Sequence, residues 1–278
     1  MAKQYWNKKV VLITGGSSGI GLAAAKQLAA AGSHVWLAAR RLELLEPALK
    51  EVQAARRESS QVCGIISADV SDSQQAKRII ETVTKSVGAP DVLINSAGIS
   101  QPGYVQDLSP QVFERLMQVN YLGTVYVTGA VLPAMIKRGS GHIINLSSAT
   151  GYMGIFGYTA YGATKYAVAG YSEALRAEMK RHGIRVSVAF PTDTDTAQLA
   201  YEIPFKPAEM IAIEGNAKPL SADKVAHSIL RQAEKGQYMI LPGTDALLFY
   251  LLTSKLPKAL VFTIMDMMAV QGKKTKIA

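Results

Sequence analysis

The sequence predicts an α/β protein in which one domain is built on a doubly wound parallel β-sheet. Two observations lead to this prediction. Short apolar runs rich in Val, Ile and Leu alternate with helical patterns along most of the chain. Repeated β-α-β units of this kind form a parallel sheet that is covered by helices on both faces. The chain also has no internal repeat and no low-complexity linker that would divide it.

The first half of the chain repeats a strand followed by a helix. The run "KKVVLIT" at 8–14 is β-branched, apolar and closed by glycines, which favours a buried strand. The segment "GIGLAAAKQLAAAG" at 19–32 is an alanine-rich helical pattern that ends at a glycine. The following units predict strands at 34–39, 61–70 and 90–98 and helices at 42–57 and 73–88.

The second half continues the alternation with longer helices. Residues 109–139 form one long helical pattern, and the segment 161–182 is a second. The remaining elements are predicted as strands at 141–148, 184–191 and 237–243 and a helix at 221–236. We therefore expect a single domain over 1–245.

Two regions depart from this rhythm. Residues 197–220 carry three prolines and no clean period, so they predict a long loop or a lid of short helices. Loops of this length inside a compact domain are usually functional. Residues 246–278 form an apolar extension that ends in the basic run "KKTK".

Composition limits the class of protein. With 49% apolar and 18% charged residues, the chain of 278 residues is globular and long enough for one large core. Its single cysteine, Cys63, excludes an internal disulfide and a cysteine zinc site, and fits a reducing compartment. The start passes directly into a strand, without the separate apolar segment of a secretory signal. These features predict a cytoplasmic protein.

The charge is basic but dispersed. The chain has 30 Lys and Arg against 21 Asp and Glu, a net charge of +9. The basic residues occur as scattered pairs with no aromatic-interleaved stripe, so we do not expect nucleic-acid binding. The four histidines show no ligand spacing, and no metal site is expected.

A glycine-rich loop follows the first strand directly and opens the first helix. In "TGGSSGIG", Gly15 permits a tight turn, Gly19 lets backbone N–H groups approach a pyrophosphate, and Gly21 allows the helix to pack closely on the strand. The positive end of the helix then faces the anion. The alternative is a plain glycine-rich turn, but the position between strand and helix favours dinucleotide binding on a Rossmann fold.

The second strand indicates which dinucleotide is bound. NAD-binding folds of this layout place a carboxylate after strand two, where it binds the ribose 2′-hydroxyl. Here Ala39 takes that position and Arg40 and Arg41 follow it. An arginine can hold a 2′-phosphate bidentately, and Ser17 can add a hydroxyl contact. The alternative is that the arginines only begin a solvated helix. We predict NADPH/NADP⁺ as the cofactor.

The stretch "YTAYGATK" contains two tyrosines and one lysine. On a helix, Tyr161 and Lys165 stand at i and i+4 on one face, whereas Tyr158 lies outside this pairing. An ammonium group beside a phenol lowers its pKa from the ordinary value of about 10 and makes it a usable proton donor. A buried tyrosine beside a surface lysine is the simpler alternative, and the pair alone does not decide between them.

A set of motifs in order resembles the short-chain dehydrogenase/reductase family over residues 8 to 245. The motifs are "TGGSSGIG", Asp69 after strand three, "NSAG" at 95–98, Asn120 in "QVNYLG", "NLSS" before Gly151, and "YGATK". The resemblance implies a catalytic quartet of Asn120, Ser148, Tyr161 and Lys165. The family's serine lies thirteen residues before its tyrosine, which pairs Ser148 with Tyr161, whereas Tyr158 would require Asn145.

The resemblance also implies a role for each of these residues. Ser148 would hold a substrate carbonyl, Tyr161 would give it a proton, and Lys165 would lower the pKa of the tyrosine and anchor the nicotinamide ribose. Asn120 would hold a water that links Lys165 to solvent. The predicted cofactor contacts are Gly15, Ser17, Ser18, Gly19, Ile20, Gly21, Arg40, Arg41, Asp69, Val70, Asn95, Ala97, Gly98, Tyr161, Lys165, Pro191 and Thr196. One departure is Thr192, which stands where the family usually has glycine and puts the geometry of that turn in question.

Within the family, "PTDTDT" and the apolar end most resemble the 3-ketodihydrosphingosine (3-ketosphinganine) reductase group. The resemblance implies NADPH-dependent reduction of a long-chain ketone in sphingolipid synthesis at a membrane face, the cytosolic face of the endoplasmic reticulum in a eukaryote. Charged residues and Pro257 divide residues 246–270, so neither half reaches the about 20 residues that span a bilayer. The segment predicts interfacial helices, a lid over an acyl-chain tunnel, or the interface of a homo-oligomer.

Two other functions stay open from the sequence. A carbonyl reductase for a steroid, a retinoid or another hydrophobic ketone would keep every catalytic residue. A nucleotide-sensing regulator could use the same fold without turnover. The intact pairing of Tyr161 with Lys165 argues against a sensor, because a sensor has no use for it.

Overall fold

The computed structural model describes residues 5–215 and 218–275, with side chains as far as residue 271. A seven-stranded sheet forms the centre, in the order β3-β2-β1-β4-β5-β6-β9, and every neighbouring pair is parallel. The strands are β1 (Val10–Thr14), β2 (His34–Ala39), β3 (Cys63–Ser67), β4 (Val92–Asn95), β5 (Gly141–Leu146), β6 (Ile184–Ala189) and β9 (Met239–Ile240). This confirms the predicted doubly wound α/β fold, although the last strand is shorter than 237–243.

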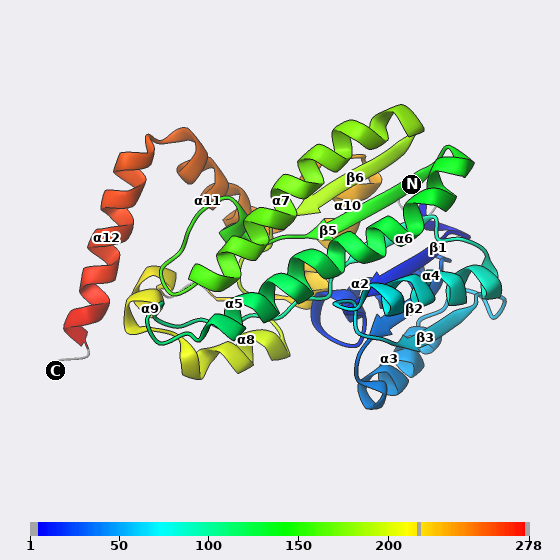
Figure 1. Cartoon of the computed structure of the whole chain (residues 1–278), viewed down its shortest axis with the longest axis horizontal. Coiled ribbons are helices and arrows are strands. Elements are labelled where there is room, and N and C mark those ends of the chain that lie inside the picture. The colour runs from blue at the N-terminus through cyan, green and yellow to red at the C-terminus, as the bar shows by residue number, and fades with distance from the viewer. Residues whose placement is uncertain (1–4, 216–217, 276–278) are drawn as a thin grey trace.

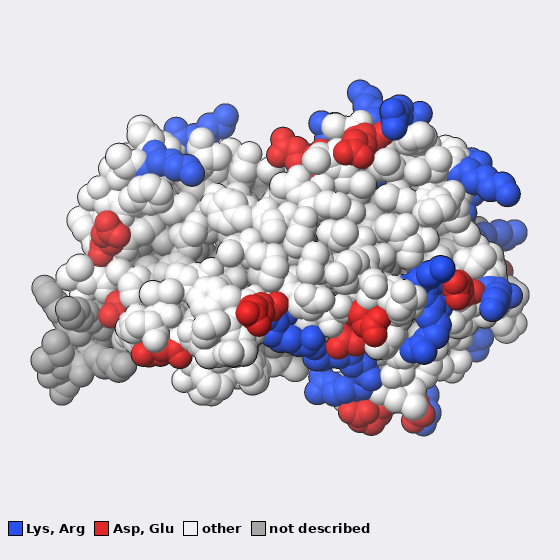
Figure 2. Space-filling view, in the orientation of Figure 1, with Lys and Arg blue, Asp and Glu red and all other residues white. Residues whose placement is uncertain are grey.

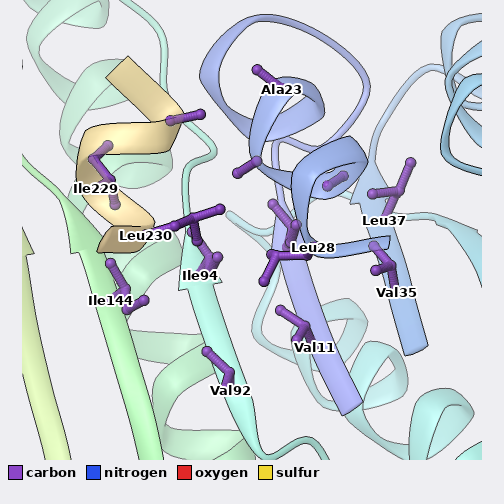
Figure 3. Packing of buried hydrophobic residues seen from close by; sticks show 14 of the residues in the cluster. Val11, Ala23, Leu28, Val35, Leu37, Val92, Ile94, Ile144, Ile229 and Leu230 are labelled. Atoms are coloured by element: carbon purple, nitrogen blue, oxygen red, sulfur yellow. The ribbon is translucent and has the colours of Figure 1, made fainter. Parts of the chain in front are cut away.

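Helices cover both faces of the sheet (Figure 1). One face packs against α2 (Gly19–Ala30), α3 (Leu42–Ala54) and α10 (Ala222–Glu234), and Figure 3 shows apolar side chains of α2 and α10 meeting those of the strands. The other face packs against α4 (Ser73–Val87), α6 (Gly123–Arg138) and α7 (Thr159–Met179). Alternate strand residues supply the two cores, as expected for strands buried on both sides.

The strand order reverses between β1 and β4, which are neighbours in the sheet. Their last residues, Thr14 and Asn95, lie in register, and β5 ends beside them with Asn145 paired to Asn95. Loops from these strand ends separate at this point and leave a crevice, where folds of this type bind ligands. The topology therefore brings the glycine-rich loop and the segment after β5 to the same edge.

The predicted long helix at 109–139 is continuous but not uniform. It consists of α5 (Pro110–Leu116), a π-helical turn over Met117–Leu122 and then α6. Asn120 lies in the π-helical turn, and such turns are frequent at functional sites. Among the described residues this is the one helix long and apolar enough to cross a membrane. Its apolar residues include Val127, Val131 and Met135 of the core, which accounts for that composition.

The region 197–220 is a lid of short helices. It contains α8 (Ala197–Glu202), a 3-10 turn (Ile203–Phe205) and α9 (Ala208–Glu214). Two short parallel strands, β7 (Thr194–Asp195) and β8 (Leu220–Ser221), join its two ends. The sequence showed no period here because each helix has less than three turns.

The chain ends in two helices, α11 (Gly243–Lys255) and α12 (Lys258–Thr275), joined at Pro257. Helix α12 projects from the sheet and packs against α9 of the lid (Figure 1). Figure 2 shows few charged side chains over this part of the molecule, whereas Lys and Arg gather over the half that holds β1 to β3. The basic "KKTK" run lies outside the residues whose side chains are described.

Candidate active site

A cleft of about 1270 Å³ opens at the edge of the sheet where the strand order reverses. It extends from the glycine-rich loop, past the ends of β4 and β5, to the lid and α11. The predicted site residues that line it are Gly15, Ser17, Ser18, Gly19, Ile20, Arg40, Arg41, Asp69, Val70, Ala97, Gly98, Ser148, Tyr161, Lys165, Pro191 and Thr196. Three predicted residues, Gly21, Asn95 and Asn120, lie beneath the lining.

The glycine-rich loop is packed too closely for side chains. Gly15 has a φ of +67°, and a Cβ there would lie 2.7 Å from the backbone of Ala97. A Cβ on Gly21 would lie 2.4 Å from the carbonyl oxygen of Gly15. These contacts confirm the tight turn and the close packing of helix on strand that the motif predicts.

The N-terminus of α2 is prepared for an anion. Its cap residue, Ser18, has an extended backbone and makes no side-chain capping bond, and the first turn contains no acidic residue. The first backbone N–H groups of the helix therefore lack a capping side chain, and the positive end of the dipole is not neutralised by a carboxylate. Gly19, with a φ of +53°, exposes backbone here. These features fit the pyrophosphate of a dinucleotide.

Beside this loop, the residues after β2 and β3 form the next part of the cleft. Arg40 and Arg41 line it directly after Ala39, the last residue of β2. Asp69 forms a 3.2 Å ion pair with Arg115. Burial raises the pKa of Asp69, but hydrogen bonds from Ser71 and Arg115 outweigh it and hold that pKa below its ordinary value. Asp69 is thus fixed as an anion with its own cation, whereas Arg40 and Arg41 form no ion pair among the described residues.

A buried polar network lies under the cleft. The side-chain amide of Asn95 donates to Asn145 at 2.8 Å and to Thr128 at 3.0 Å, and the amide of Asn145 donates to Ser172 at 2.9 Å. The network ties β4 and β5 to α6 and α7, so Asn95 supports the central sheet. A direct contact of Asn95 with the cofactor remains a prediction.

Asn120 holds the backbone after β4. Its side-chain oxygen accepts a hydrogen bond from the N–H of Ile99 at 2.8 Å, and its amide group donates to the carbonyl of Ile99 and to Thr164, both at 2.9 Å. Both hydrogen atoms of its side-chain amide are donated to protein acceptors. A water held by Asn120 would therefore bind at a remaining acceptor and not at the amide hydrogens, and its catalytic role stays a prediction.

Tyr161 and Lys165 lie on the face of α7 that is turned to the cleft. The ammonium nitrogen of Lys165 lies 5.5 Å from the centroid of the Tyr161 ring and donates to the carbonyl oxygen of Leu146 at 2.9 Å. Burial lowers the pKa of Lys165 to about 8, although the charge of Glu202 acts in the opposite direction. The helical pairing predicted from the spacing is present.

The pKa of Tyr161 lies above the ordinary phenol value in this structure. Burial is the main cause and Glu202 adds to it, while hydrogen bonds with Ser148 and Gln198 act in the lowering direction. The lowering effect of Lys165 on this pKa stays a prediction. The raised pKa keeps the hydroxyl protonated at neutral pH, so that Tyr161 can donate a proton.

Glu202 of the lid was missed from the sequence, and its partner is Tyr158, which the sequence excluded as the proton donor. The hydroxyl of Tyr158 donates to the carboxylate of Glu202 in the lid, and its ring lies 5.1 Å from that of Tyr161. Burial and the charge of Glu202 raise the pKa of Tyr158 strongly. Tyr158 is therefore bound to the lid, as its place outside the pairing with Lys165 allows. Tyr158 and Glu202 are 44 positions apart, so no local spacing in the sequence indicates this contact.

The turn after β6 accommodates Thr192 without strain. Outside glycine, the only described residue with a positive φ is Lys8, so Thr192 has an ordinary backbone conformation. The carbonyl of Pro191 accepts from the N–H of Ala149 at 2.9 Å, which ties the turn to the segment after Ser148. Thr196 caps α8 by accepting from the N–H of Leu199 at 3.3 Å. Its contact with the cofactor stays a prediction.

Several named proteins are similar to this chain in sequence. A protein of Bos taurus named 3-ketodihydrosphingosine reductase is 39% identical over 245 residues, which cover 88% of this chain and 73% of the relative. A protein of the same name in Dictyostelium discoideum is 34% identical, and the match covers 84% of this chain and 74% of the relative. The mouse protein named dehydrogenase/reductase SDR family member 7B is 31% identical, covering 99% and 85%.

Solved structures share the architecture. Levodione reductase superposes with a TM-score of 0.77 at 29% identity, covering 87% of this chain and 98% of its own. A 3-ketoacyl-(acyl-carrier-protein) reductase from Brucella melitensis was solved in complex with NADH. It superposes with a TM-score of 0.72 at 25% identity, covering 87% of this chain and 93% of its own.

The family comparison completes the assignment. A sequence profile described as short chain dehydrogenase matches residues 9–204. With the cleft geometry, these findings establish an oxidoreductase that acts on a CH–OH or C=O group with a nicotinamide cofactor. The chain belongs to the short-chain dehydrogenase family.

Proposed function

We propose that this protein reduces the keto group of a long-chain lipid with NADPH, and that the substrate is 3-ketodihydrosphingosine, converted to dihydrosphingosine in sphingolipid biosynthesis. The observation that carries the proposal is the meeting of Ser148, Tyr161 and Lys165 on one wall of a cleft that begins at the glycine-rich loop. A cleft of about 1270 Å³ exceeds the common range of small-ligand pockets, about 300–1,000 Å³. It has room for a dinucleotide and part of a lipid.

Each catalytic side chain has a role that its surroundings support. When bound, the reduced nicotinamide supplies a hydride. Ser148 donates a hydrogen bond to the substrate's carbonyl oxygen, and Tyr161 transfers its proton to the same oxygen. The hydroxyl of Ser148 is near enough to Tyr161 to act on its pKa, and both side chains line the same cleft, so both can meet one substrate oxygen. Lys165 holds a positive charge beneath the ring, which favours the tyrosinate formed after the transfer.

The preference for NADPH follows from the residues after β2. Ala39 lacks a carboxylate that would repel a 2′-phosphate, and Arg40 and Arg41 line the cleft beside it. A guanidinium binds a phosphate bidentately, which a neutral side chain cannot do. Within this proposal, Arg40 and the hydroxyl of Ser17, which both line the cleft, would hold the 2′-phosphate.

The end of the chain supports a lipid substrate and contact with a membrane surface. Exposed large apolar side chains on α11 and α12 are Leu247, Leu248, Leu251, Leu252, Leu260, Phe262, Ile264, Met267 and Val270. Apolar area of this kind inserts into the headgroup region without spanning the bilayer. We assign the enzyme to the cytoplasm with peripheral attachment, at the cytosolic face of the endoplasmic reticulum in a eukaryote. If α11 and α12 instead join two copies, the same residues form a homo-oligomer interface.

An NADPH-oxidation assay with a panel of ketones tests the substrate. We expect kcat/KM for 3-ketodihydrosphingosine to exceed that for a steroid ketone, a retinaldehyde and a short aliphatic ketone. A higher value for the steroid or retinaldehyde would assign the enzyme to another hydrophobic carbonyl compound. Binding of NADPH without oxidation by any ketone would favour a sensor.

A further inference from the structure

The lid places one carboxylate inside the active-site cleft. Glu202, the last residue of α8, is 3% exposed and lines the cleft together with Tyr158 and Tyr161. Its neighbours fix both oxygens: one accepts from the hydroxyl of Tyr158, and the other accepts from the side-chain amide of Gln198 at 3.1 Å. Both oxygens therefore act as hydrogen-bond acceptors.

Within the described part of the chain, Glu202 has no cationic partner within ion-pair distance, unlike two neighbouring carboxylates that also line the cleft. Among the described residues, Asp193 and Glu214 both pair with Lys206, at 3.6 and 2.6 Å, while Glu202 forms no ion pair within 4.0 Å. A buried carboxylate is costly unless a cation compensates it. Each of its oxygens has one protein donor, and a carboxylate can accept about four hydrogen bonds, so acceptor sites remain for a further donor.

The carboxylate lies close to the reacting groups. Its Tyr158 partner packs its ring 5.1 Å from the ring of Tyr161. The negative charge of Glu202 acts on both Tyr161 and Lys165. It contributes in the raising direction to the pKa of each, although burial leaves the pKa of Lys165 below its ordinary value. A substrate whose carbonyl oxygen meets Tyr161 therefore brings the atoms next to its carbonyl carbon toward Glu202.

We propose that Glu202 determines specificity by binding the ammonium group of an α-amino ketone. The inference rests on the proposed function: 3-ketodihydrosphingosine carries its amino group on the carbon beside the keto carbon. The substrate's ammonium supplies the ion-pair partner that Glu202 lacks, and its N–H groups reach the remaining acceptor sites of Glu202. Steroids, retinoids and simple ketones have no such group, so the same contact discriminates against them by leaving the buried carboxylate uncompensated.

The test compares two ketones on three proteins. The ketones are 3-ketodihydrosphingosine and a desamino analogue of equal chain length, with hydrogen in place of the amino group. The proteins are the wild type, Glu202→Gln and Glu209→Gln. Glu209 is a matched control on the neighbouring α9, bonded to Tyr104 at 2.8 Å and outside the cleft lining. NADPH titration and a melting curve accompany each protein.

We expect the wild type to prefer the amino ketone by at least about tenfold in kcat/KM. Glu202→Gln should lower kcat/KM for the amino ketone by about 10- to 100-fold, the range of a charge-assisted hydrogen bond, and leave the desamino ketone within about threefold. Glu209→Gln should change neither. Equal losses on both ketones would show that Glu202 only supports Tyr158 and the lid, and would overturn the inference. Unchanged selectivity would also overturn it.

The wild-type comparison keeps the inference testable if Glu202→Gln does not fold. Equal kcat/KM for the two ketones on the wild type would then refute the ammonium contact, and a preference for the amino ketone would support it. Failure of the proposed function looks different. In that case the wild type reduces neither long-chain ketone while it reduces another carbonyl compound.

Discussion

The ammonium group of Lys165 donates a hydrogen bond of 2.9 Å to the carbonyl oxygen of Leu146, the last residue of β5. This bond fixes a buried charge of α7 to the end of a central strand. The ammonium is thereby held beneath the ring of Tyr161, and one of its donors is used by the sheet itself. The core of the fold therefore positions Lys165 in the catalytic wall.

Tyr161→Phe should abolish measurable ketone reduction and leave NADPH binding nearly unchanged. Proton donation by a positioned group contributes typically about 10²–10⁴-fold, and the lost contact to the oxygen adds to this. Tyr158→Phe should retain most activity, because Tyr158 bonds to Glu202 in the lid. Steady-state kinetics and a fluorescence titration of NADPH measure both effects. The reverse pattern of losses would show that Tyr158 is the proton donor.

The lowered pKa of Lys165 predicts a pH dependence of stability. Its pKa is about 8 in the folded protein against an ordinary 10.5, so the unfolded state binds more protons between these values. The contribution of Lys165 to the free energy of unfolding is therefore unfavourable below pH 8 and becomes less so as the pH rises toward 10.5.

Urea unfolding of the wild type and Lys165→Met at pH 7.5 and 9.5 measures this contribution. We expect the stability of the wild type relative to the variant to increase by about 2 kcal/mol over this interval, since one pKa unit corresponds to 1.36 kcal/mol. The comparison with the variant removes groups that titrate in both proteins. A constant difference at the two pH values would contradict the lowered pKa.

Arg40→Ala should weaken NADPH binding by roughly 1.5–3 kcal/mol, the value of a hydrogen bond to a charged group, and affect NADH little. Ala39→Asp should shift the preference toward NADH, because the new carboxylate repels the 2′-phosphate. Dissociation constants for both cofactors, measured at one salt concentration, test these effects. If Arg40→Ala weakens the binding of NADPH and of NADH equally, then Arg40 does not contact the 2′-phosphate.

The apolar surface of α11 and α12 predicts reversible membrane binding. Leu248 and Phe262 are 59% and 50% exposed, so the double change to Asp leaves the core intact. We expect it to reduce partitioning onto anionic vesicles by at least tenfold, because each buried side chain contributes about 1.5–3 kcal/mol. Val62→Asp, at the β3 edge, is the control and should have no effect. A change in oligomeric state with unchanged vesicle binding would instead identify a subunit interface.

Features with a local cause could be predicted from the sequence. The strands, the glycine-rich loop and the pairing of Tyr161 with Lys165 depend on short spacings, and the structure places them as predicted. The lid contact between Tyr158 and Glu202 joins residues 44 positions apart, so no local pattern could predict it. The π-helical turn at Asn120 was likewise missed, because one irregular turn barely disturbs the helical period of its long helix.

The most direct test of the central claim follows the hydride into the product. The enzyme is incubated with 3-ketodihydrosphingosine and NADPH labelled with deuterium at C4 of the nicotinamide, using each labelled face in turn. Mass spectrometry should detect dihydrosphingosine with one deuterium on C3 from one of the two faces, and none with Tyr161→Phe. If no dihydrosphingosine forms while the enzyme is folded and binds NADPH, the protein is not a reductase of this lipid.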